Sequence, residues 1–360
     1  MNNKIKTILC GIAYSRVGNA LVTSLGIKRM WTALHVRSVK KHLRDDARKE
    51  FQKAEAPGCF DDFCDALKKH WVSYSEYASQ YEFYKLTETE REEYISRLRM
   101  AYFYWRYAPG SEKAIFRNKP RFLKKFSKYV NRKWLFVPEA SFDDFQKLIT
   151  SCDCIIKPSD GKLGRGVFKV TKEESAGRVK ELYDSCVKNR ALIEECIVSC
   201  DELKAFHPES LNTIRVVTVS NQKKSEVFGS FLRTGVGGSV VDNAHAGGIF
   251  AQINVQEGVI ESDGINTSGQ SFERHPDSNL VFKGTKIPHW DTIVKTCCEA
   301  ALLSGNPITG WDVAINQKGL IEFVEGNYGP DFDVMQSPMK VGVKKRIYAI
   351  IKAYFGIELA

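Results

Sequence analysis

Segment 155–168 carries residue types suited to phosphate binding. A run of apolar residues leads to Lys157, and three glycines follow shortly after it: Gly161, Gly164 and Gly166. Glycines let backbone N–H groups approach phosphate oxygens, and a lysine supplies a point charge for the same oxygens. The segment lacks the GKS or GKT end of a Walker loop, and a strand rather than a helix follows it, unlike a Rossmann turn. A plain glycine β-hairpin is the alternative interpretation.

Segment 310–327 combines two carboxylates with an amide. Asp312 lies in one predicted strand and Glu325 in the next, and Asn327 follows two residues later. A turn at 316–319 makes the two strands a hairpin, which brings the carboxylates near each other. Two carboxylates and an amide oxygen form a hard-oxygen set suited to Mg²⁺ that also holds nucleotide phosphates.

The direction of the side chains in the second strand supports this metal site. Strict strand alternation places Glu325 on the same side as Ile321 and Phe323. An apolar setting is costly for a carboxylate unless a cation compensates its charge. Glu322 points the other way, and we interpret it as solvent-exposed or structural. A surface salt bridge is the alternative for an acidic hairpin of this kind.

Local composition and hydrophobic periodicity predict the helices and strands that position these residues. The chain from 31 to about 108 is dense in charged and aromatic residues at helical spacing, which predicts several helices. Short β-branched runs separated by glycine turns predict strands after residue 150. Several of them are joined without a helix between them, so we expect an α+β protein with a largely antiparallel sheet in its last half. The predicted strands are 135–138, 154–156, 167–170, 191–193, 214–219, 227–232, 312–315 and 320–324, and the later predicted helices are 116–130 and 289–303.

The two segments, in this order, resemble the ATP-grasp superfamily. Its members place a Glu 13 residues after a strand Asp and an Asn two residues later, as Asp312, Glu325 and Asn327 do here. More narrowly, the chain resembles the sugar-transfer-associated ATP-grasp family over about residues 115–340. The motifs that carry this resemblance are SLNTIRVVTV, VDN…GGIFAQI, HPDS with a following IPHWD, and GWDVAI…VEGN.

The resemblance implies an ATP-grasp fold, in which two α+β lobes clasp ATP, preceded by a mostly helical N-terminal region. We expect the helical region at 1–110, the N-terminal lobe with the phosphate loop at 111–209, and the C-terminal lobe with the Mg²⁺ site at 210–360. Residues 1–110 themselves contain no motif that matches the family.

The resemblance also assigns roles to individual residues. It implies catalytic roles for Lys157 and Arg215, with the arginine acting on the transferred phosphoryl group. A structural ion pair with an acidic residue of the sheet is the alternative for Arg215. ATP would contact Lys119, Lys157, the glycines Gly161, Gly164 and Gly166, the hinge residues Glu194, Glu195 and Ile197, and Glu202 or Asp201 at the ribose; Mg²⁺ would contact Asp312, Glu325 and Asn327.

The implied reaction is ligation. ATP phosphorylates a substrate carboxylate, and an amine attacks the acylphosphate to give an amide. We expect the substrates to belong to a sugar acid or a polysaccharide precursor, with Arg233, Asn243 and His245 as candidate contacts. Two alternatives stay open: a kinase that phosphorylates a sugar or polyol hydroxyl, and a non-catalytic nucleotide-binding or interaction protein.

Composition limits the partners and the compartment. The 360 residues carry a formal net charge of +10, with the basic excess before residue 135. Runs of this kind are more often solvated helix faces than recognition patches, so we expect no nucleic acid, while peripheral membrane contact through the basic N-terminal helices stays open. The ten cysteines are scattered without a CxxC pattern, which favours reduced thiols and a cytoplasmic protein.

Overall fold

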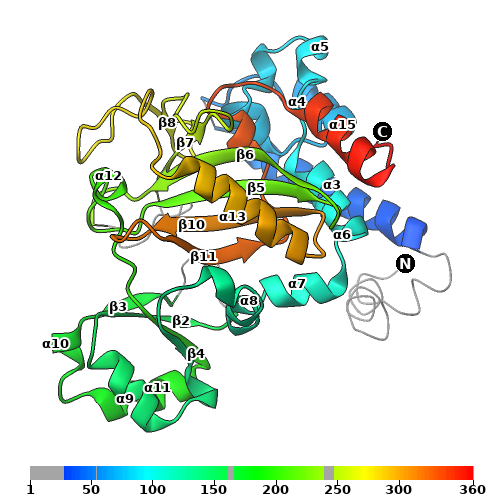
Figure 1. Cartoon of the computed structure of the whole chain (residues 1–360). Coiled ribbons are helices and arrows are strands. Elements are labelled where there is room, and N and C mark those ends of the chain that lie inside the picture. Colours follow the sequence, from blue (N-terminus) through cyan, green and yellow to red (C-terminus); the bar gives the residue numbers. More distant parts are fainter. Residues whose placement is uncertain (1–27, 54, 161–165, 239–246, 360) are drawn as a thin grey trace. The chain divides into compact units, whose positions relative to one another are not determined.

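The computed structural model describes residues 28–53, 55–160, 166–238 and 247–359, and these form two compact units (Figure 1). The first unit comprises the described residues up to Ala78 together with Phe83–Lys85. The second comprises Ser79–Glu82 and the chain from Leu86 onward. Within the described ranges, no helix combines the length and the apolar character needed to cross a lipid bilayer.

The first unit is helical and has an aromatic core. The ring of Phe63 is fully buried, and the rings of Phe51, Tyr74 and Tyr77 meet it at centroid distances of 6.0, 6.2 and 5.5 Å. Edge and tilted ring contacts of this kind stabilise aromatic clusters. The helices are α3 (Lys28–Glu50), α4 (Phe60–His70) and η2 (Phe83–Lys85), and η1 (Glu76–Gln80) continues into the second unit.

The second unit contains two antiparallel sheets, of which the smaller is formed early in the chain. Its strand order is β1-β4-β2-β3, and α9 and α11 pack against it through a core that includes Phe145, Ile156 and Leu182 (Figure 1). We call it the small sheet. Its elements are β1 (Trp134–Phe136), η4 (Val137–Glu139), α9 (Phe142–Ile149), β2 (Cys154–Pro158), β3 (Phe168–Val170), α10 (Lys172–Ser175), α11 (Val179–Lys188) and β4 (Ala191–Glu195).

The large sheet has seven strands in the order β11-β10-β5-β6-β7-β8-β9, so β11 is an edge strand. All of its pairings are antiparallel, as the short turns between the predicted strands indicate. Its strands are β5 (Thr213–Ser220), β6 (Ser225–Thr234), β7 (Ile249–Ile253), β8 (Gly264–Ile265), β9 (Ser271–Phe272), β10 (Ile308–Ile315) and β11 (Ile321–Asn327).

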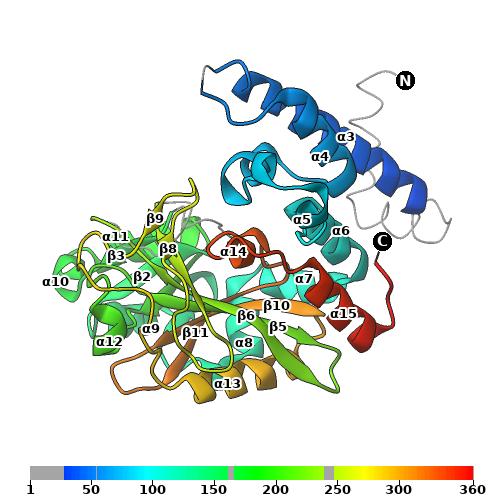
Figure 2. The ribbon, with the colours of Figure 1, turned by 90° about the horizontal axis from the view of Figure 1, so that it is seen from above.

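Helices cover both faces of the large sheet. Helix α13 lies across one face, and α6, α14 and α15 lie on the other (Figure 2). Strand alternation divides the apolar residues between these layers, because Val216 packs with α13 whereas Val217 packs with α15. These four helices and the others of the second unit outside the small sheet are α5 (Glu88–Arg91), α6 (Arg97–Tyr107), α7 (Gly110–Phe116), α8 (Lys119–Lys125), η3 (Ser127–Tyr129), α12 (Asp201–Lys204), α13 (Trp290–Leu303), α14 (Asp333–Gln336) and α15 (Lys344–Phe355).

Most predicted elements exist, but the basic helix predicted at 116–130 is wrong. The structure instead has α7, α8 and η3 in succession over this part of the chain. Asn118 caps α8 by accepting a hydrogen bond from the Arg121 N–H at 3.0 Å, and Pro120 occupies the first turn of that helix. Both residues favour a helix start, which breaks the continuous helix. Strand β7, within the segment that we described only as a family motif, was not predicted.

Candidate functional site

The hairpin of β10 and β11 brings the predicted metal ligands together. Asp312 lies directly opposite Glu325 in the strand pairing, and Gly310 lies opposite Asn327. Side chains of directly paired residues project from the same face of a sheet. The two carboxylates and the Asn327 amide therefore share one face of the large sheet.

A β-bulge in β11 corrects the predicted direction of Glu325. The pairing shifts register between Asp312 and Val313, so Val324 is an extra residue between the paired Phe323 and Glu325. Phe323 and Val313 lie in the core beneath α13, whereas Glu325 faces the same way as Asp312. The prediction that Glu325 shares its side with Phe323 is wrong, because a bulge resets the strand alternation.

Two arginines from neighbouring strands bind the Asp312 carboxylate. Arg215 is paired opposite Asp312 and donates from Nε to Oδ1 and from Nη2 to Oδ2, the latter at 2.8 Å. Arg233 donates from Nη1 to Oδ2 at 2.9 Å. Burial disfavours the ionised carboxyl, but the two guanidinium charges outweigh it and hold the pKa of Asp312 well below its usual range. The ion pair that we considered as the alternative role of Arg215 thus involves the candidate metal ligand itself.

Glu325 carries a charge that the surrounding protein only partly compensates. The residue keeps access to solvent, although protein atoms crowd its carboxyl group. This crowding and the adjacent charge of Asp312 raise the pKa of Glu325 above its usual range. A divalent cation between the two carboxylates would relieve the repulsion, and Asn327 adds an amide oxygen of the type that Mg²⁺ accepts. The residues present therefore fit Mg²⁺.

The two predicted phosphate-binding lysines lie close to this hairpin. Lys157 of β2 is 7% exposed and forms an ion pair with Glu194 of β4. Lys119 is the first residue of α8, and its burial and the charge of Lys157 lower the pKa of its ammonium group. The charge of Glu325 acts on Lys119, and the charge of Lys157 acts on Glu325. The small sheet thus presents its lysine to the carboxylates of the large sheet.

The phosphate loop is described only at its ends, because Gly161 and Gly164 lie outside the described residues. Gly166 is exposed, with a φ of +72° that favours glycine. At the other end, the backbone N–H of Lys119 donates to the carbonyl of Ser159 at 3.0 Å. This bond joins the start of α8 to the end of β2, where the loop begins.

The predicted hinge residues lie in different surroundings. Glu194 is 4% exposed, and its carboxylate forms ion pairs with Lys157 and Arg132. The Glu195 carboxylate accepts a hydrogen bond from the Lys133 N–H at 3.2 Å. Ile197 is half-buried and Glu202 is exposed on α12. Their contacts with adenine and ribose stay predictions.

The residues predicted for the second substrate are only partly described. Asn243 and His245 lie outside the described residues. The guanidinium of Arg233 contacts Asp312, so the structure places it beside the candidate metal ligands. A contact between Arg233 and a substrate carboxylate stays a prediction.

Sequence reasoning missed one buried residue of this region and misjudged another. Arg132 is 7% exposed and binds both Glu194 and Glu322. Glu322 is 2% exposed, so its interpretation as solvent-exposed is wrong and the structural one is correct. Apolar neighbours on both sides of Glu322 could have indicated its burial, whereas Arg132 looks like any other member of a basic stretch.

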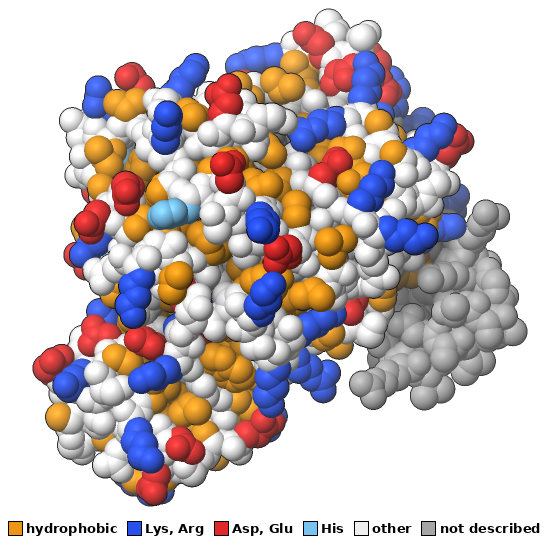
Figure 3. Space-filling model, in the orientation of Figure 1, with side chains coloured by type: hydrophobic (Ala, Val, Ile, Leu, Met, Phe, Trp, Pro, Cys, Tyr) orange, Lys and Arg blue, Asp and Glu red, His pale blue; other side chains and the backbone are white. Residues whose placement is uncertain are grey.

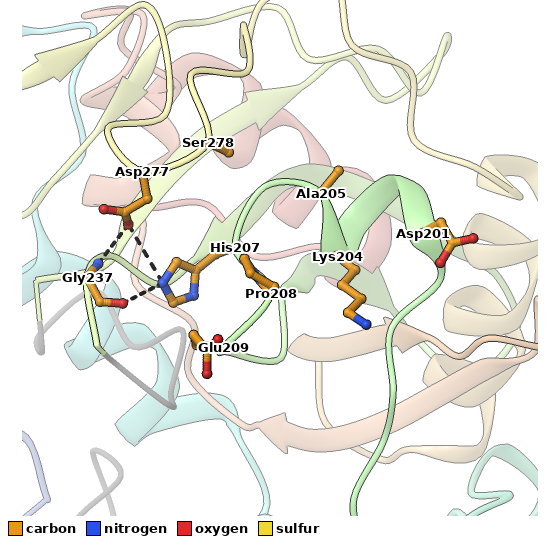
Figure 4. Close-up of a pocket in the computed structure, with 9 residues that line it drawn as sticks. All are labelled: Asp201, Lys204, Ala205, His207, Pro208, Glu209, Gly237, Asp277 and Ser278. Atoms are coloured by element: carbon orange, nitrogen blue, oxygen red, sulfur yellow. Dashed lines mark hydrogen bonds and ion pairs between the residues drawn. The ribbon is translucent and has the colours of Figure 1, made fainter.

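A pocket of about 610 Å³ lies beside α12 (Figure 4). The ring of His207 is fixed, because Nδ1 accepts a hydrogen bond from the Ser210 N–H at 3.1 Å and Nε2 donates to the Gly237 carbonyl at 2.7 Å. Asp277 accepts a hydrogen bond from the Gly237 N–H at 2.7 Å, which ties two loops together. Asp201, the other carboxylate considered for ribose, lines this pocket. The lining is Asp201, Lys204, Ala205, His207, Pro208, Glu209, Gly237, Asp277 and Ser278.

Charged side chains of both signs are interspersed on the face of the molecule shown in Figure 3. Lys and Arg side chains alternate with Asp and Glu side chains rather than gathering into one basic area on that face. Mixed charges are typical of a solvated surface, whereas a continuous basic stripe indicates nucleic-acid binding.

Solved structures with partial similarity to this chain include an ATP-grasp ligase, an amino acid ligase and a synthetase. The ATP-grasp ligase PsnB complexed with a minimal precursor has 15% identity and a TM-score of 0.44, over 69% of this chain and 64% of that chain. The L-amino acid ligase from Bacillus licheniformis has 13% identity and a TM-score of 0.40, over 69% and 50%. D-alanyl-alanine synthetase A from Vibrio cholerae O1 has 11% identity and a TM-score of 0.42, over 69% and 68%. The chain thus spans less than two thirds of the first two. No curated protein matches in sequence.

A comparison with protein families matches residues 98–352 to the family described as sugar-transfer associated ATP-grasp. This match confirms the resemblance carried by the sequence motifs, and with it the predicted α+β ATP-grasp fold preceded by a helical N-terminal region. Because the match covers well over half of the 360 residues, the chain belongs to the sugar-transfer associated ATP-grasp family.

Proposed function

We propose that this protein is an ATP-dependent ligase that joins a carboxylate to an amine through an acylphosphate. The observation that carries the proposal is the pairing of Asp312 with Glu325 within electrostatic reach of Lys157 and Lys119. Clustered carboxylates for a divalent cation and lysines for phosphates are the groups that a site for ATP requires. Membership of the ATP-grasp family supports the same conclusion.

Different residues of the chain bind the phosphates of ATP and the Mg²⁺ that accompanies them. Lys157 and Lys119 neutralise the phosphates from the side of the small sheet, and Asp312, Glu325 and Asn327 hold Mg²⁺ from the side of the large sheet. Bound Mg²⁺ would supply charge neutralisation of the phosphate oxygens. Arg215 stabilises negative charge on the phosphoryl group during transfer through the guanidinium N–H groups that do not donate to Asp312.

The chemistry needs no nucleophile from the protein. A carboxylate oxygen of the acid attacks the γ-phosphorus, the bond to the β–γ bridging oxygen breaks, and ADP leaves. The amine nitrogen then attacks the acyl carbon, the carbon–oxygen bond to the phosphate breaks, and inorganic phosphate leaves while the amine loses a proton. The chain therefore has to position the substrates and to neutralise the charge that develops during the two steps.

We propose a sugar acid or a polysaccharide precursor as one substrate, for example a uronic acid that is joined to an amino acid. The family description associates its members with sugar transfer, which supports this class. We place the reaction in the cytoplasm, where ATP and reduced thiols are available.

A matrix of uronic acids and amines tests the proposal. We expect the purified protein to release ADP and phosphate with Mg²⁺ only when an acid and an amine are both present. Glu325→Gln, which keeps the side-chain shape but loses the charge, should lower this release by at least about 100-fold. Exposed Glu257→Gln is the matched control. Phosphate that stays on a sugar hydroxyl would show a kinase instead, and absence of ADP release in the whole matrix would contradict ligation of this substrate class.

A further inference from the structure

Arg132 lies buried between the small sheet and the edge of the large sheet. It stands between η3 and β1, and its side chain is 3% exposed. Its guanidinium has five N–H donors. Nε and Nη2 donate to Glu194 at 3.2 and 2.7 Å, Nη1 donates to the Phe323 carbonyl at 2.8 Å and to Glu322 at 3.4 Å, and Nη2 also reaches the Val324 carbonyl at 3.4 Å. Every nitrogen of the side chain is therefore engaged.

One end of this arrangement fixes the bulge that orients Glu325. The outer side of β11 has no strand partner in the large sheet, so its carbonyls need donors from elsewhere. Arg132 supplies them at Phe323 and at Val324, the extra residue of the bulge. Asn131 adds a bond from its side chain to the Ile321 carbonyl at 3.2 Å. The same bulge turns Glu325 toward Asp312.

The other end fixes the phosphate-binding lysine. Glu194 accepts hydrogen bonds from Arg132 and forms the ion pair with Lys157. Arg132 and Lys157 carry two positive charges, Glu194 and Glu322 carry two negative ones, and each of the four residues is at most 7% exposed. A balanced buried quartet of this kind has few alternative arrangements, because breaking any pair leaves an uncompensated buried charge.

We propose that Arg132 is a positioning residue that sets the separation between Lys157 and Glu325. A continuous series of contacts runs from Lys157 through Glu194 and Arg132 to the bulge beside Glu325. ATP phosphates can contact the lysine and the metal ligands at the same time only if this separation matches the nucleotide. The inference rests on the proposed function, and it assigns to Arg132 the coupling of the lysine of the small sheet to the metal ligands of the large sheet.

The Mg²⁺ dependence of ADP binding tests this role without requiring the unidentified substrates. Calorimetry gives the dissociation constant of ADP with Mg²⁺ and with a chelator, and their ratio measures how strongly the metal strengthens nucleotide binding. Arg132→Lys keeps the charge but loses the planar fork, so it cannot hold Glu194 and the bulge carbonyls together. We expect the ratio to fall by about 10-fold or more in this variant, with a smaller change in chelator.

Two further variants keep the test decisive. Glu322→Gln preserves the shape of the side chain and can still accept from the Asn131 N–H, so it covers the case in which Arg132→Lys does not fold. We expect the ratio to fall in this variant as well, but by less, about 3-fold. Arg178→Lys, at an exposed arginine that caps α11 and pairs with Glu181, is the matched control and should keep the wild-type ratio.

The outcomes separate the inference from the function on which it rests. A folded Arg132→Lys or Glu322→Gln protein with a lower melting temperature but a wild-type ratio would reduce these residues to a structural role and overturn the inference. Wild-type protein that binds ADP equally with and without Mg²⁺ would count against the proposed function instead. A reduced ratio in Arg132→Lys or Glu322→Gln with an unchanged Arg178→Lys ratio supports the coupling.

Discussion

Asp312 is both the ion-pair partner of two arginines and a candidate Mg²⁺ ligand. Three N–H groups from Arg215 and Arg233 neutralise it, so the buried carboxylate is stable without a cation. Glu325 opposite it is more exposed and has its pKa raised by crowding and by Asp312. Together the two acids and two arginines have no net charge. A cation can therefore bind to the two carboxylates, and anionic phosphates to the two arginines, with side chains that already lie in place.

Arg215→Lys tests whether this arginine acts on the reaction or only on Asp312. A lysine keeps the charge but cannot make the two parallel bonds to Asp312 or grip two phosphoryl oxygens. We expect kcat for ADP release to fall by about 100-fold with little change in ATP affinity. Measurement of kcat together with the melting temperature separates the roles, and Arg274→Lys at an exposed loop arginine is the control. A destabilised variant with full turnover would remove Arg215 from the mechanism.

At the scale of elements, the hairpin of β10 and β11 owes its geometry to the helices that pack against it. The aromatic rings of Phe116 on α7 and Phe122 on α8 approach β11 at Gly326, between Glu325 and Asn327. Since α8 also begins with Lys119, the same packing positions a lysine and two candidate metal ligands. Close approach of the rings is possible only because residue 326 has no side chain.

Gly326→Ala should destabilise the protein through this contact. The added Cβ would lie 2.5 Å from a ring carbon of Phe122 and 2.6 Å from one of Phe116, so the aromatic rings or the strand must move. We expect a loss of about 1–3 kcal/mol in the free energy of unfolding, measured in urea, together with reduced Mg²⁺-dependent activity. Gly110→Ala, where a Cβ would meet nothing within 4 Å, is the control and should be nearly neutral. Equal stability of both variants would contradict the packing argument.

The raised pKa of Asp333, at the start of α14, should make the stability of the protein depend on pH. Burial and the charge of Asp331 raise the pKa of Asp333 from the usual 3.8 to about 6, although Arg97 opposes the shift. Between these values the folded chain binds more protons than the unfolded chain, so this group lowers stability as pH rises. Two pKa units correspond to about 3 kcal/mol, an upper bound on the cost of the buried carboxylate above pH 6.

Asp333→Asn removes this contribution. We expect the variant to unfold at higher urea than the wild type at pH 7, and the difference to shrink as pH falls from 6 toward 4. Unfolding curves across this range, with exposed Asp263→Asn as control, isolate the contribution of Asp333 from that of other acids. A difference that stays constant with pH would show that Asp333 does not titrate in this window.

At the scale of the whole molecule, the described candidate residues for ATP and Mg²⁺ all belong to the second unit. They come from both sheets of that unit, since Lys157 and Glu194 lie in the small sheet and Arg215, Asp312 and Glu325 in the large one. The nucleotide would thus be held by two sheets that Arg132 already connects. Ligand binding should consequently stabilise the second unit as a whole.

Mg²⁺-bound ADP should raise the melting temperature of the second unit. A ligand at 100 times its dissociation constant adds about 2.7 kcal/mol to the stability of the state that binds it. Scanning calorimetry with ADP and Mg²⁺, with ADP and a chelator, and with Mg²⁺ alone gives the comparison. We expect the largest shift in the first condition and a smaller one when the metal is removed. Equal shifts in the first two conditions would contradict a metal-assisted nucleotide site.

Local signals in the sequence were sufficient for much of the fold. Glycine turns and β-branched runs located β2, β4, β5, β6, β10 and β11, because strand propensity and turn chemistry act over a few neighbouring residues. The sequence also placed helix α13 within one residue of its observed start. Short strands such as β8 and β9, with two residues each, carry too little pattern to be found in this way.

The family and the residue types of the candidate site could be predicted from the amino-acid sequence, because motif spacing along a strand can be recognised without knowing the rest of the fold. The face that Glu325 uses could not, since the bulge at Val324 depends on donors from a distant segment. The tertiary structure also decided that Arg215 and Arg233 share Asp312, and that Arg132 joins the two sheets. A buried ion pair forms between residues far apart in the chain, and no local propensity encodes which charges will meet when water is excluded.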